Sequence, residues 1–232
     1  MRLDNDKLFE FFKEREILAL YHANTVGTSN TFFESRGLLS RGAVENLNLH
    51  QTPQASDNID KNLGVWNDVF LDTCDLHSFF GRENKYGPVL FELDRELVRN
   101  EEFEIWITKN NPIYWNKNTA THDRYFQSVE ELRDKWGLIE RQRKMITIRN
   151  NRTPILFDYV RRIIVDDPKV TINEIDGSQT HLFNEVFHKI RKTISNDHPL
   201  KGKFTFRNCG TCWCTDNYLN QKTPNDLKRL FL

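Results

Sequence analysis

Glycine is scarce in this chain, and the glycine-rich motifs that bind phosphates in many enzymes are absent. Only 10 of the 232 residues are glycine, and neither G-x-G-x-x-G nor G-x-x-x-x-G-K-[ST] occurs. The H-E-x-x-H metal motif and the G-x-S-x-G nucleophile motif are also missing. An enzyme with this sequence would therefore bind its substrate without a glycine-rich phosphate loop.

Long apolar runs are missing too. No stretch approaches the roughly 18 apolar residues of a membrane-spanning helix. The charged N-terminal segment MRLDNDKLFEFFKERE lacks the continuous apolar core of a signal peptide. Without an export signal, the few cysteines are expected to be reduced thiols or metal ligands rather than disulfides. We therefore expect a soluble cytoplasmic protein.

The chain has no net charge, because 33 basic residues balance 33 acidic ones. A protein that binds long duplex DNA normally carries a positive charge, so this balance argues against that class. A local basic groove remains compatible with the composition. The length suits one domain with an appendage.

The pattern of apolar residues predicts a mixed α+β fold. Strands outnumber helices after residue 65, and they do not alternate regularly with helices. Helices are expected over residues 3–17, 28–36, 128–137 and 181–195. Strands are expected over residues 17–23, 68–72, 87–94, 102–109, 144–150 and 161–168. Residues 37–66 read mostly as polar loop, and a connection this long is unusual unless it is functional.

The stretch LYHANTVGTSNTFFESRGLLSRG, residues 20–42, places polar residues at the end of a predicted strand. Strand ends beside loops are common positions for chemistry. The order of Tyr21-His22, a short helix and GLLSRG resembles the start of the ADP-ribosyltransferase fold. In that fold a His or Arg on the first strand anchors NAD.

The resemblance extends to DarT-like ADP-ribosyltransferase toxins over residues 20–168. VFLDTCDLHSFF and YGPVLFELD occupy the places of their NAD-contacting loop and next strand. WITKNNPIYW followed by YFQSVEELRDKWG is similar to a later passage of these toxins. MITIRNNRTPILFDYVRRIIVDDP matches the position of their catalytic strand and its partner.

This resemblance implies an ADP-ribosyltransferase-like mixed sheet with flanking helices and a Cys-containing C-terminal extension. The corresponding segments are an N-terminal helix over 1–19, the core over 20–168 and the extension over 169–232. The implied activity is mono-ADP-ribosylation of nucleic acid, preferentially single-stranded RNA such as messenger RNA, in phage defence. An antitoxin protein, and a chaperone that holds the toxin–antitoxin pair, are the implied partners.

The resemblance also implies site residues. His22 can hydrogen-bond a ribose hydroxyl, and Arg41 can pair with a pyrophosphate, although a half-buried strand-end His and a surface Arg are the structural alternatives. The expected NAD-binding residues are Tyr21, His22, Asn24, Arg41, Asp72, Asp75 and His77. The expected catalytic residues are Arg41, Met145 and Arg149.

The segments TKNNPIYW and ITIRNN place aromatic rings beside amides and an arginine, which suits splayed bases of single-stranded nucleic acid. Asn111, Trp115 and Arg149 are the expected substrate-binding residues. Core packing is the alternative for the tryptophans: it is expected for Trp106 and Trp136, whereas Trp115 stays open between the two roles.

The predicted catalytic strand departs from the DarT pattern, which has a Glu at its head. Here the strand begins Arg143-Lys144-Met145-Ile146, and Glu140 could serve only if the chain bends. Three alternatives stay open: another acid acts, the alignment is displaced, or the activity is lost. The last alternative leaves a binding module without catalysis.

The segment FLDTCDLH supports a competing hypothesis, a metal-dependent nuclease that uses Asp72, Asp75 and His77. On a continuous strand Asp75 and His77 would share one face and Asp72 the other, so a metal site would need a turn here. A polar strand-to-loop exit is the simpler alternative.

The tail HPLKGKFTFRNCGTCWC contains three closely spaced cysteines. Three thiolates and a histidine would suit tetrahedral structural zinc. The predicted ligands are His198, Cys209, Cys212 and Cys214. Buried thiols and a redox role are the alternatives.

Overall fold

The computed structural model describes residues 2–79, 85–137, 145–174, 176–208, 213–220 and 222–232. Over these residues, a seven-stranded mixed sheet has the strand order β11-β8-β4-β1-β3-β6-β5. Neighbouring strands are antiparallel except β8 and β11, which are parallel. The strands of this sheet are β1 Ala19–Asn24, β3 Val69–Asp72, β4 Val89–Asp94, β5 Ile105–Ile107, β6 Met145–Ile148, β8 Val160–Asp167 and β11 Phe204–Asn208. The predicted α+β class, a mixed sheet with flanking helices, is confirmed.

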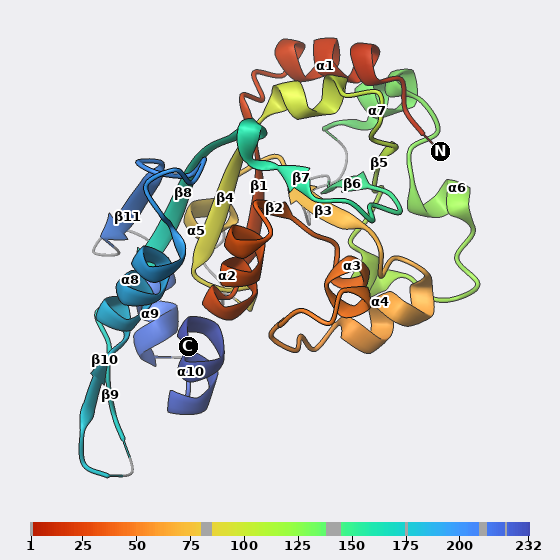
Figure 1. Ribbon diagram of the computed structural model, residues 1–232. Coiled ribbons are helices and arrows are strands. Elements are labelled where there is room, and N and C mark those ends of the chain that lie inside the picture. The colour runs from red at the N-terminus through yellow and green to blue at the C-terminus, as the bar shows by residue number, and fades with distance from the viewer. Residues whose placement is uncertain (1, 80–84, 138–144, 175, 209–212, 221) are drawn as a thin grey trace.

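Two smaller pairs of strands accompany this sheet. One pairs β2 Gly37–Leu38 with β7 Ile155–Leu156, and the other is a ribbon of β9 Thr171–Asn173 and β10 Gln179–His181. Figure 1 shows the ribbon of β9 and β10 extending away from the body of the molecule.

Helices flank the main sheet (Figure 1). The α1 helix contacts η1 and α7, whereas α2 contacts α8 and α10. The helices are α1 Asn5–Glu14, α2 Val26–Glu34, α3 Arg41–Asn46, α4 Asp57–Leu63, α5 Leu76–Phe79, α6 Thr121–Arg124, α7 Val129–Lys135, α8 Leu182–Thr193, α9 Trp213–Asn220 and α10 Pro224–Phe231, with short 3₁₀ helices η1 Arg95–Arg99, η2 Pro112–Tyr114 and η3 Phe157–Tyr159. No helix among these described residues is both long and apolar enough to cross a bilayer.

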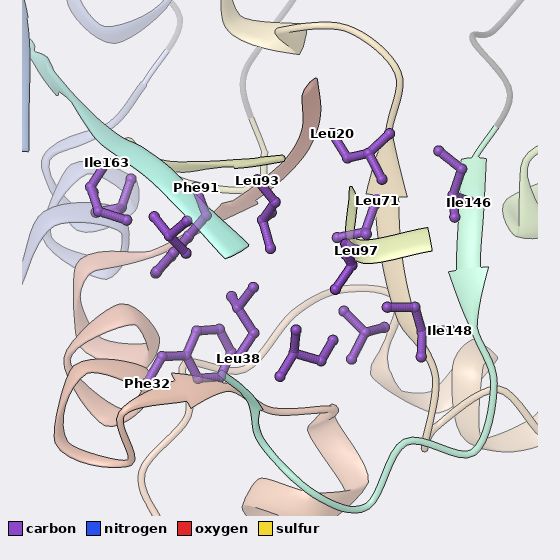
Figure 2. Close-up of a cluster of buried hydrophobic side chains, with 14 of the residues drawn as sticks. Leu20, Phe32, Leu38, Leu71, Phe91, Leu93, Leu97, Ile146, Ile148 and Ile163 are labelled. Carbon is purple, nitrogen blue, oxygen red and sulfur yellow. The ribbon is translucent and has the colours of Figure 1, made fainter. Parts of the chain in front are cut away.

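The core lies where alternating apolar side chains of the sheet meet the helices (Figure 2). Leu20, Leu71 and Ile146, from neighbouring strands β1, β3 and β6, are fully buried. On α2, the Phe32 ring meets Phe91 of β4 edge-on, with 5.9 Å between centroids. This packing holds α2 beside β1 and fixes where the first residues of the helix lie.

The segment predicted as loop, residues 37–66, contains β2 and the helices α3 and α4, so that prediction was wrong in detail. The Ser40 side chain caps α3 by accepting a hydrogen bond from the Ala43 N–H at 3.2 Å. The α4 helix ends at Gly64, whose φ of 72° lies in the left-handed region that glycine tolerates. Short capped helices bury few residues, which is why the hydrophobic periodicity did not reveal them.

The C-terminal segment contributes directly to the architecture. β11 pairs in parallel with β8 at the edge of the main sheet, and α8 and α10 pack against α2. The α8 helix buries Leu182, Val186 and Ile190 along one face. The division at residues 19 and 168 remains a prediction.

Candidate active site

A pocket of about 210 Å³ opens between strands β1 and β3. These two strands are in register at a single pair, Tyr21 with Asp72. The pocket is lined by the end of β1, residues 22–24, and by Val69, Phe70 and Asp72 of β3. The site therefore forms where the two strands separate and their backbones no longer pair.

His22 stands at this separation. Its Nδ1 lies 2.9 Å from the carbonyl oxygen of Phe70, so Nδ1 carries the proton and donates it. The Nε2 atom is then an acceptor, with the Asn24 side-chain nitrogen at 3.5 Å. Burial lowers the pKa of His22, and the positive charge of Arg41 lowers it further. His22 is thus a neutral imidazole on the wall of the pocket.

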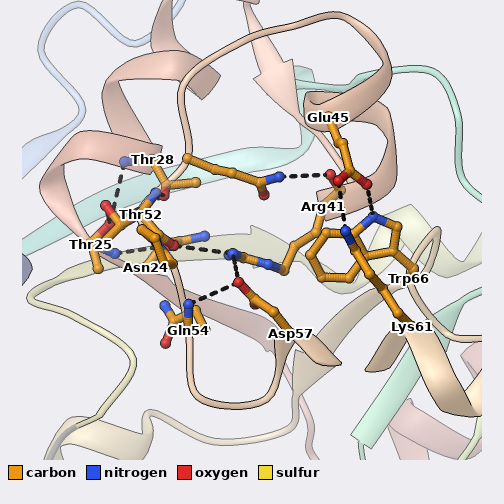
Figure 3. A network of polar contacts seen from close by, with 12 residues as sticks. Asn24, Thr25, Thr28, Arg41, Glu45, Thr52, Gln54, Asp57, Lys61 and Trp66 are labelled. Atoms are coloured by element: carbon orange, nitrogen blue, oxygen red, sulfur yellow. Dashed lines mark hydrogen bonds and ion pairs between the residues drawn. The ribbon is translucent and has the colours of Figure 1, made fainter. Parts of the chain in front are cut away.

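Arg41 supplies a positive charge to the same pocket (Figure 3). Its Nη2 donates to Asp57 at 2.8 Å and to the Thr52 carbonyl at 3.1 Å. The guanidinium lies over the Trp66 ring, 5.3 Å from its centroid. In the part of the chain that the structure describes, the buried Nε of Arg41 has no hydrogen-bond partner. A guanidinium with an unused donor suits a phosphate or ribose oxygen.

The first turn of α2 forms another wall. Thr25 caps this helix, and its hydroxyl donates to the Thr52 hydroxyl at 2.8 Å. The Asn24 side chain accepts from the Thr25 N–H at 2.9 Å. A Cβ added at Gly27 would lie 3.0 Å from the His50 ring nitrogen. His50 and Thr52 therefore pack tightly on the start of α2, and Figure 3 shows Thr52 beside the pocket-lining Thr28.

Three carboxylates line the pocket: Asp60, Asp68 and Asp72. Asp68 accepts hydrogen bonds from Arg149 Nη1 at 2.6 Å and from the Asn150 N–H at 3.0 Å. Burial raises the pKa of Asp68 to about 6, although the Arg149 charge opposes that shift. Burial also raises the pKa of Asp60.

The structure brings together six of the predicted site residues on the wall of this one pocket. They are His22, Asn24, Arg41, Asp72, Asn111 and Met145. Sequence reasoning missed other polar or aromatic residues of the wall, among them Gln51, Gln54, Asp60, Trp66, Asp68 and Tyr86. Most of them belong to or follow the 37–66 segment, whose length was the available signal.

Three predicted NAD-binding residues lie outside the lining of this pocket. Tyr21 precedes His22 on a strand, so its side chain points to the opposite face of the sheet. Asp75 is paired with Arg207 at 2.6 Å, and His77 with the buried Asp166 at 2.9 Å.

The pKa shifts of Tyr21 and His77 are consistent with the carboxylates around them. Burial raises the pKa of Tyr21, and the carboxylates of Glu92 and Asp75 add to the effect. Burial alone would lower the pKa of His77, but Asp166 outweighs it and raises that pKa. The described residues contain no group of three or more His, Cys, Asp or Glu side chains that could hold a metal ion. The geometry therefore does not support the nuclease hypothesis.

Arg149 and Trp115 do not line the pocket either. Arg149 is held by Asp68, donates to the Tyr125 hydroxyl at 2.9 Å and lies over the Trp106 ring at 5.0 Å. The Trp115 side chain is only 8% exposed and meets the Tyr125 ring edge-on at 5.1 Å. The roles predicted for both residues place them in contact with substrate, whereas the structure shows them packed behind the pocket.

The two tryptophans expected in the core, Trp106 and Trp136, pack as predicted. Trp106 lies against the small cluster of Val65, Trp115 and Tyr125, and Trp136 meets the Phe11 ring at 5.2 Å.

The predicted zinc site receives no support. His198 is buried, and its two ring nitrogens lie 2.9 Å from the Phe33 carbonyl and 3.1 Å from the Leu200 N–H. Both nitrogens therefore serve the backbone, which leaves none for a metal. Cys209 and Cys212 lie outside the described residues, as do the side chain of Cys214 and the residues Glu140, Arg143 and Lys144.

Comparison with known proteins gives structural likeness alone. No protein-family model and no curated protein matches the sequence. DarT of Thermus sp. 2.9 in complex with ADP-ribosylated ssDNA is similar at 12% identity and a TM-score of 0.48, over 86% of this chain and 97% of that one. DarT of the same organism in complex with NAD+ is similar at 13% identity and a TM-score of 0.45, over 86% and 98%. The same DarT in complex with carba-NAD+ is similar at 12% identity and a TM-score of 0.41, over 77% of this chain and 91% of that one.

Proposed function

We propose that this protein is an NAD-dependent mono-ADP-ribosyltransferase that modifies single-stranded nucleic acid. The observation that carries the proposal is the meeting of His22, Asn24, Arg41, Asp72 and Met145 in one pocket. These residues come from three separate sequence segments that resemble DarT-like toxins; His22, Asn24, Arg41 and Asp72 are expected NAD-binding residues, and Met145 is an expected catalytic residue.

The chemical character of the pocket fits NAD as the donor. Arg41 can bind the pyrophosphate, since its Nε is available and its Nη2 is already oriented by Asp57 and Thr52. The neutral His22 presents Nε2 as an acceptor for a ribose hydroxyl. The apolar side chains of Phe32, Val69 and Phe70 give the pocket the mixed lining typical of small-molecule sites.

The mouth of the pocket fits an unpaired nucleobase as the acceptor. Ile113 and Tyr114 of η2 are 61% and 62% exposed, and Ile113 lines the pocket beside Asn111. Exposed aromatic and apolar side chains next to an amide suit a splayed base. The zero net charge favours single strands, because duplex binding depends on many phosphate contacts.

RNA is the proposed acceptor, with messenger RNA as the cellular target in phage defence. This finer assignment rests on the resemblance to toxins and on the net charge. The same resemblance supports an antitoxin protein as a partner, with a chaperone that holds the pair, since a cell must restrain such an activity. The proposed site of action is the cytoplasm.

A transfer assay tests this function. The protein is incubated with NAD labelled in its adenylate phosphate and with single-stranded RNA, single-stranded DNA or duplex DNA, with and without a chelator. We expect label to enter single-stranded RNA most strongly and the chelator to have no effect. Cleavage of RNA without NAD, abolished by the chelator, would instead establish a nuclease. Silence in both assays together with RNA binding would establish a binding module.

A further inference from the structure

We infer that Arg207 of β11 is a positioning residue, which holds one wall of the pocket in place through Leu76. The inference rests on the proposed function, because it concerns how the same pocket binds NAD. Leu76 lines the pocket, whereas its two neighbours in the chain, Asp75 and His77, lie outside the lining. Both neighbours form ion pairs with residues of the edge strands β8 and β11. The pocket wall is therefore tied to a distant part of the chain on either side of Leu76.

Arg207 binds the carboxylate of Asp75 with two nitrogen atoms. Its Nη2 donates to Asp75 Oδ2 at 2.6 Å, and its Nη1 donates to Asp75 Oδ1 at 3.4 Å. Such a fork fixes the orientation of a carboxylate as well as its place. The same Oδ1 accepts the N–H of His77 at 3.0 Å, so Asp75 closes the turn that contains Leu76. The Arg207 and Asp75 side chains are only 15% and 21% exposed, so salt screens this pair less than a surface pair.

His77 is held from the same edge of the sheet. Its Nδ1 lies 2.9 Å from Oδ2 of Asp166, and both side chains are almost fully buried. Tyr218 of α9 donates its hydroxyl to the same Oδ2 at 2.8 Å. Asp166 of β8 and Arg207 of β11 are paired in register, and Arg207 Nε lies 3.6 Å from Asp166 Oδ1. The edge of the sheet and α9 therefore hold the residues on both sides of Leu76.

The turn at Leu76 depends on tertiary contacts for its position. β3 ends at Asp72, and α5 begins at Leu76 and spans four residues. A helix of one turn is not stable by itself. A wall that moves must be ordered when a ligand binds, and this ordering costs affinity. By fixing the turn before NAD arrives, Arg207 spares the pocket that cost.

A double-mutant cycle on NAD affinity tests the inference. The variants are Leu76→Ala, Arg207→Met and the two combined, measured by calorimetry. We expect each single change to weaken NAD binding roughly 3- to 10-fold, because the Leu76 side chain is lost in one and displaced in the other. The double variant should bind no more weakly than Leu76→Ala alone, since Arg207 acts through Leu76. Effects that multiply in the double variant, or an unchanged affinity in Arg207→Met, overturn the inference.

Arg162→Met is the matched control. Arg162 of β8 also binds a buried carboxylate, that of Glu92, at 2.6 Å, and neither residue lines the pocket. Arg162→Met should keep the NAD affinity of the wild type. A loss of affinity equal to that of Arg207→Met would assign both effects to general destabilisation and overturn the inference.

Hydrogen exchange provides a readout that does not depend on NAD. The backbone N–H of His77 should exchange at least about tenfold faster in Arg207→Met than in the wild type, and at the wild-type rate in Arg162→Met. If Arg207→Met does not fold, Asp75→Asn replaces it, since Asn keeps an oxygen for that N–H but loses the charge that binds Arg207. Unchanged exchange overturns the inference. Faster exchange in Arg207→Met, together with a wild type that does not bind NAD, would instead overturn the proposed function alone.

Discussion

The imidazole of His22 donates from Nδ1 to the backbone carbonyl of Phe70, at 2.9 Å, where β1 and β3 have stopped pairing. A side chain thus replaces a rung of the backbone ladder and satisfies a carbonyl at the edge of the pocket. The same bond fixes the tautomer and turns Nε2 into an acceptor. His22 is therefore both part of the architecture and part of the proposed NAD site.

Two substitutions of His22 separate these roles. The amide nitrogen of Asn can occupy the place of Nδ1, and that of Gln the place of Nε2. We expect His22→Asn to keep the melting temperature and to weaken NAD binding about 2- to 10-fold, the range for one neutral hydrogen bond. His22→Gln should leave the Phe70 carbonyl unpaired and cost roughly 1–3 kcal/mol of stability. Equal effects of both variants on both measurements would contradict this division.

Arg41 is predicted to bind the pyrophosphate while Asp57 orients it. Arg41→Ala should weaken NAD binding roughly 10- to 100-fold, as expected for loss of one charged hydrogen-bond partner. Arg41→Lys should recover little, because an ammonium cannot satisfy Asp57, Thr52 and a phosphate in one geometry. Arg36→Ala is the matched control, since its exposed pair with Asp197 contributes little. Unchanged affinity in Arg41→Ala, measured by calorimetry, would remove Arg41 from the site.

Asp68 should make stability depend on pH in a direction unusual for an acid with a cationic partner. Its pKa is raised to about 6 in the folded protein, above its ordinary value of 3.8. The native state therefore binds the proton more tightly, and stability declines as pH rises between these values. Relative to Asp68→Asn, the wild type should lose roughly 3 kcal/mol between about pH 4 and pH 7.

Urea unfolding of both Asp68 proteins at a series of pH values measures this difference. Asp68→Asn leaves Arg149 without its carboxylate partner at every pH. The resulting loss of stability is therefore constant and does not affect how the difference in unfolding free energy changes with pH. If the wild type instead becomes more stable relative to Asp68→Asn as pH rises, the Arg149 pair outweighs burial and lowers the pKa of Asp68.

Neighbouring aromatic residues should respond oppositely to truncation. Trp115 is buried against Tyr125, so Trp115→Ala should cost about 3–5 kcal/mol of stability. Tyr114 is 62% exposed, so Tyr114→Ala should unfold like the wild type. Loss of a stacked base at Tyr114 should reduce the affinity for single-stranded RNA by roughly 1–3 kcal/mol. Thermal unfolding measures the stability of both variants, and fluorescence anisotropy with labelled RNA measures their RNA affinity. An RNA affinity unchanged in Tyr114→Ala would exclude Tyr114 from the interface.

Local sequence patterns predicted six of the seven strands of the main sheet but missed β11. Alternation and apolar runs placed β4 and β8 within two residues of their observed ends, and helical spacing placed α8 within two residues of its ends. Such signals arise from neighbouring residues along the chain and from the fixed periods of strands and helices. They also placed His22 at the end of a strand.

The site depended on contacts between distant segments. The strand period implies that Tyr21 and His22 point to opposite faces, but only the assembled sheet decides which face opens into a pocket. Asp75 and His77 were chosen from the same short motif as Asp72, yet their partners Arg207 and Asp166 lie about 90 or more residues away in the chain.

What the sequence determined by itself is the α+β class, most strands of the main sheet, the neutral charge and the presence of polar residues at the end of β1. The tertiary structure alone decided that β1 and β3 separate after one registered pair, and that Asp72 faces Met145 there. The physical reason is that a residue's face follows from local backbone geometry, whereas its neighbours follow from strand pairing across long stretches of chain. A functional site requires both the correct face and the correct neighbours, and the neighbours are set only when the chain folds.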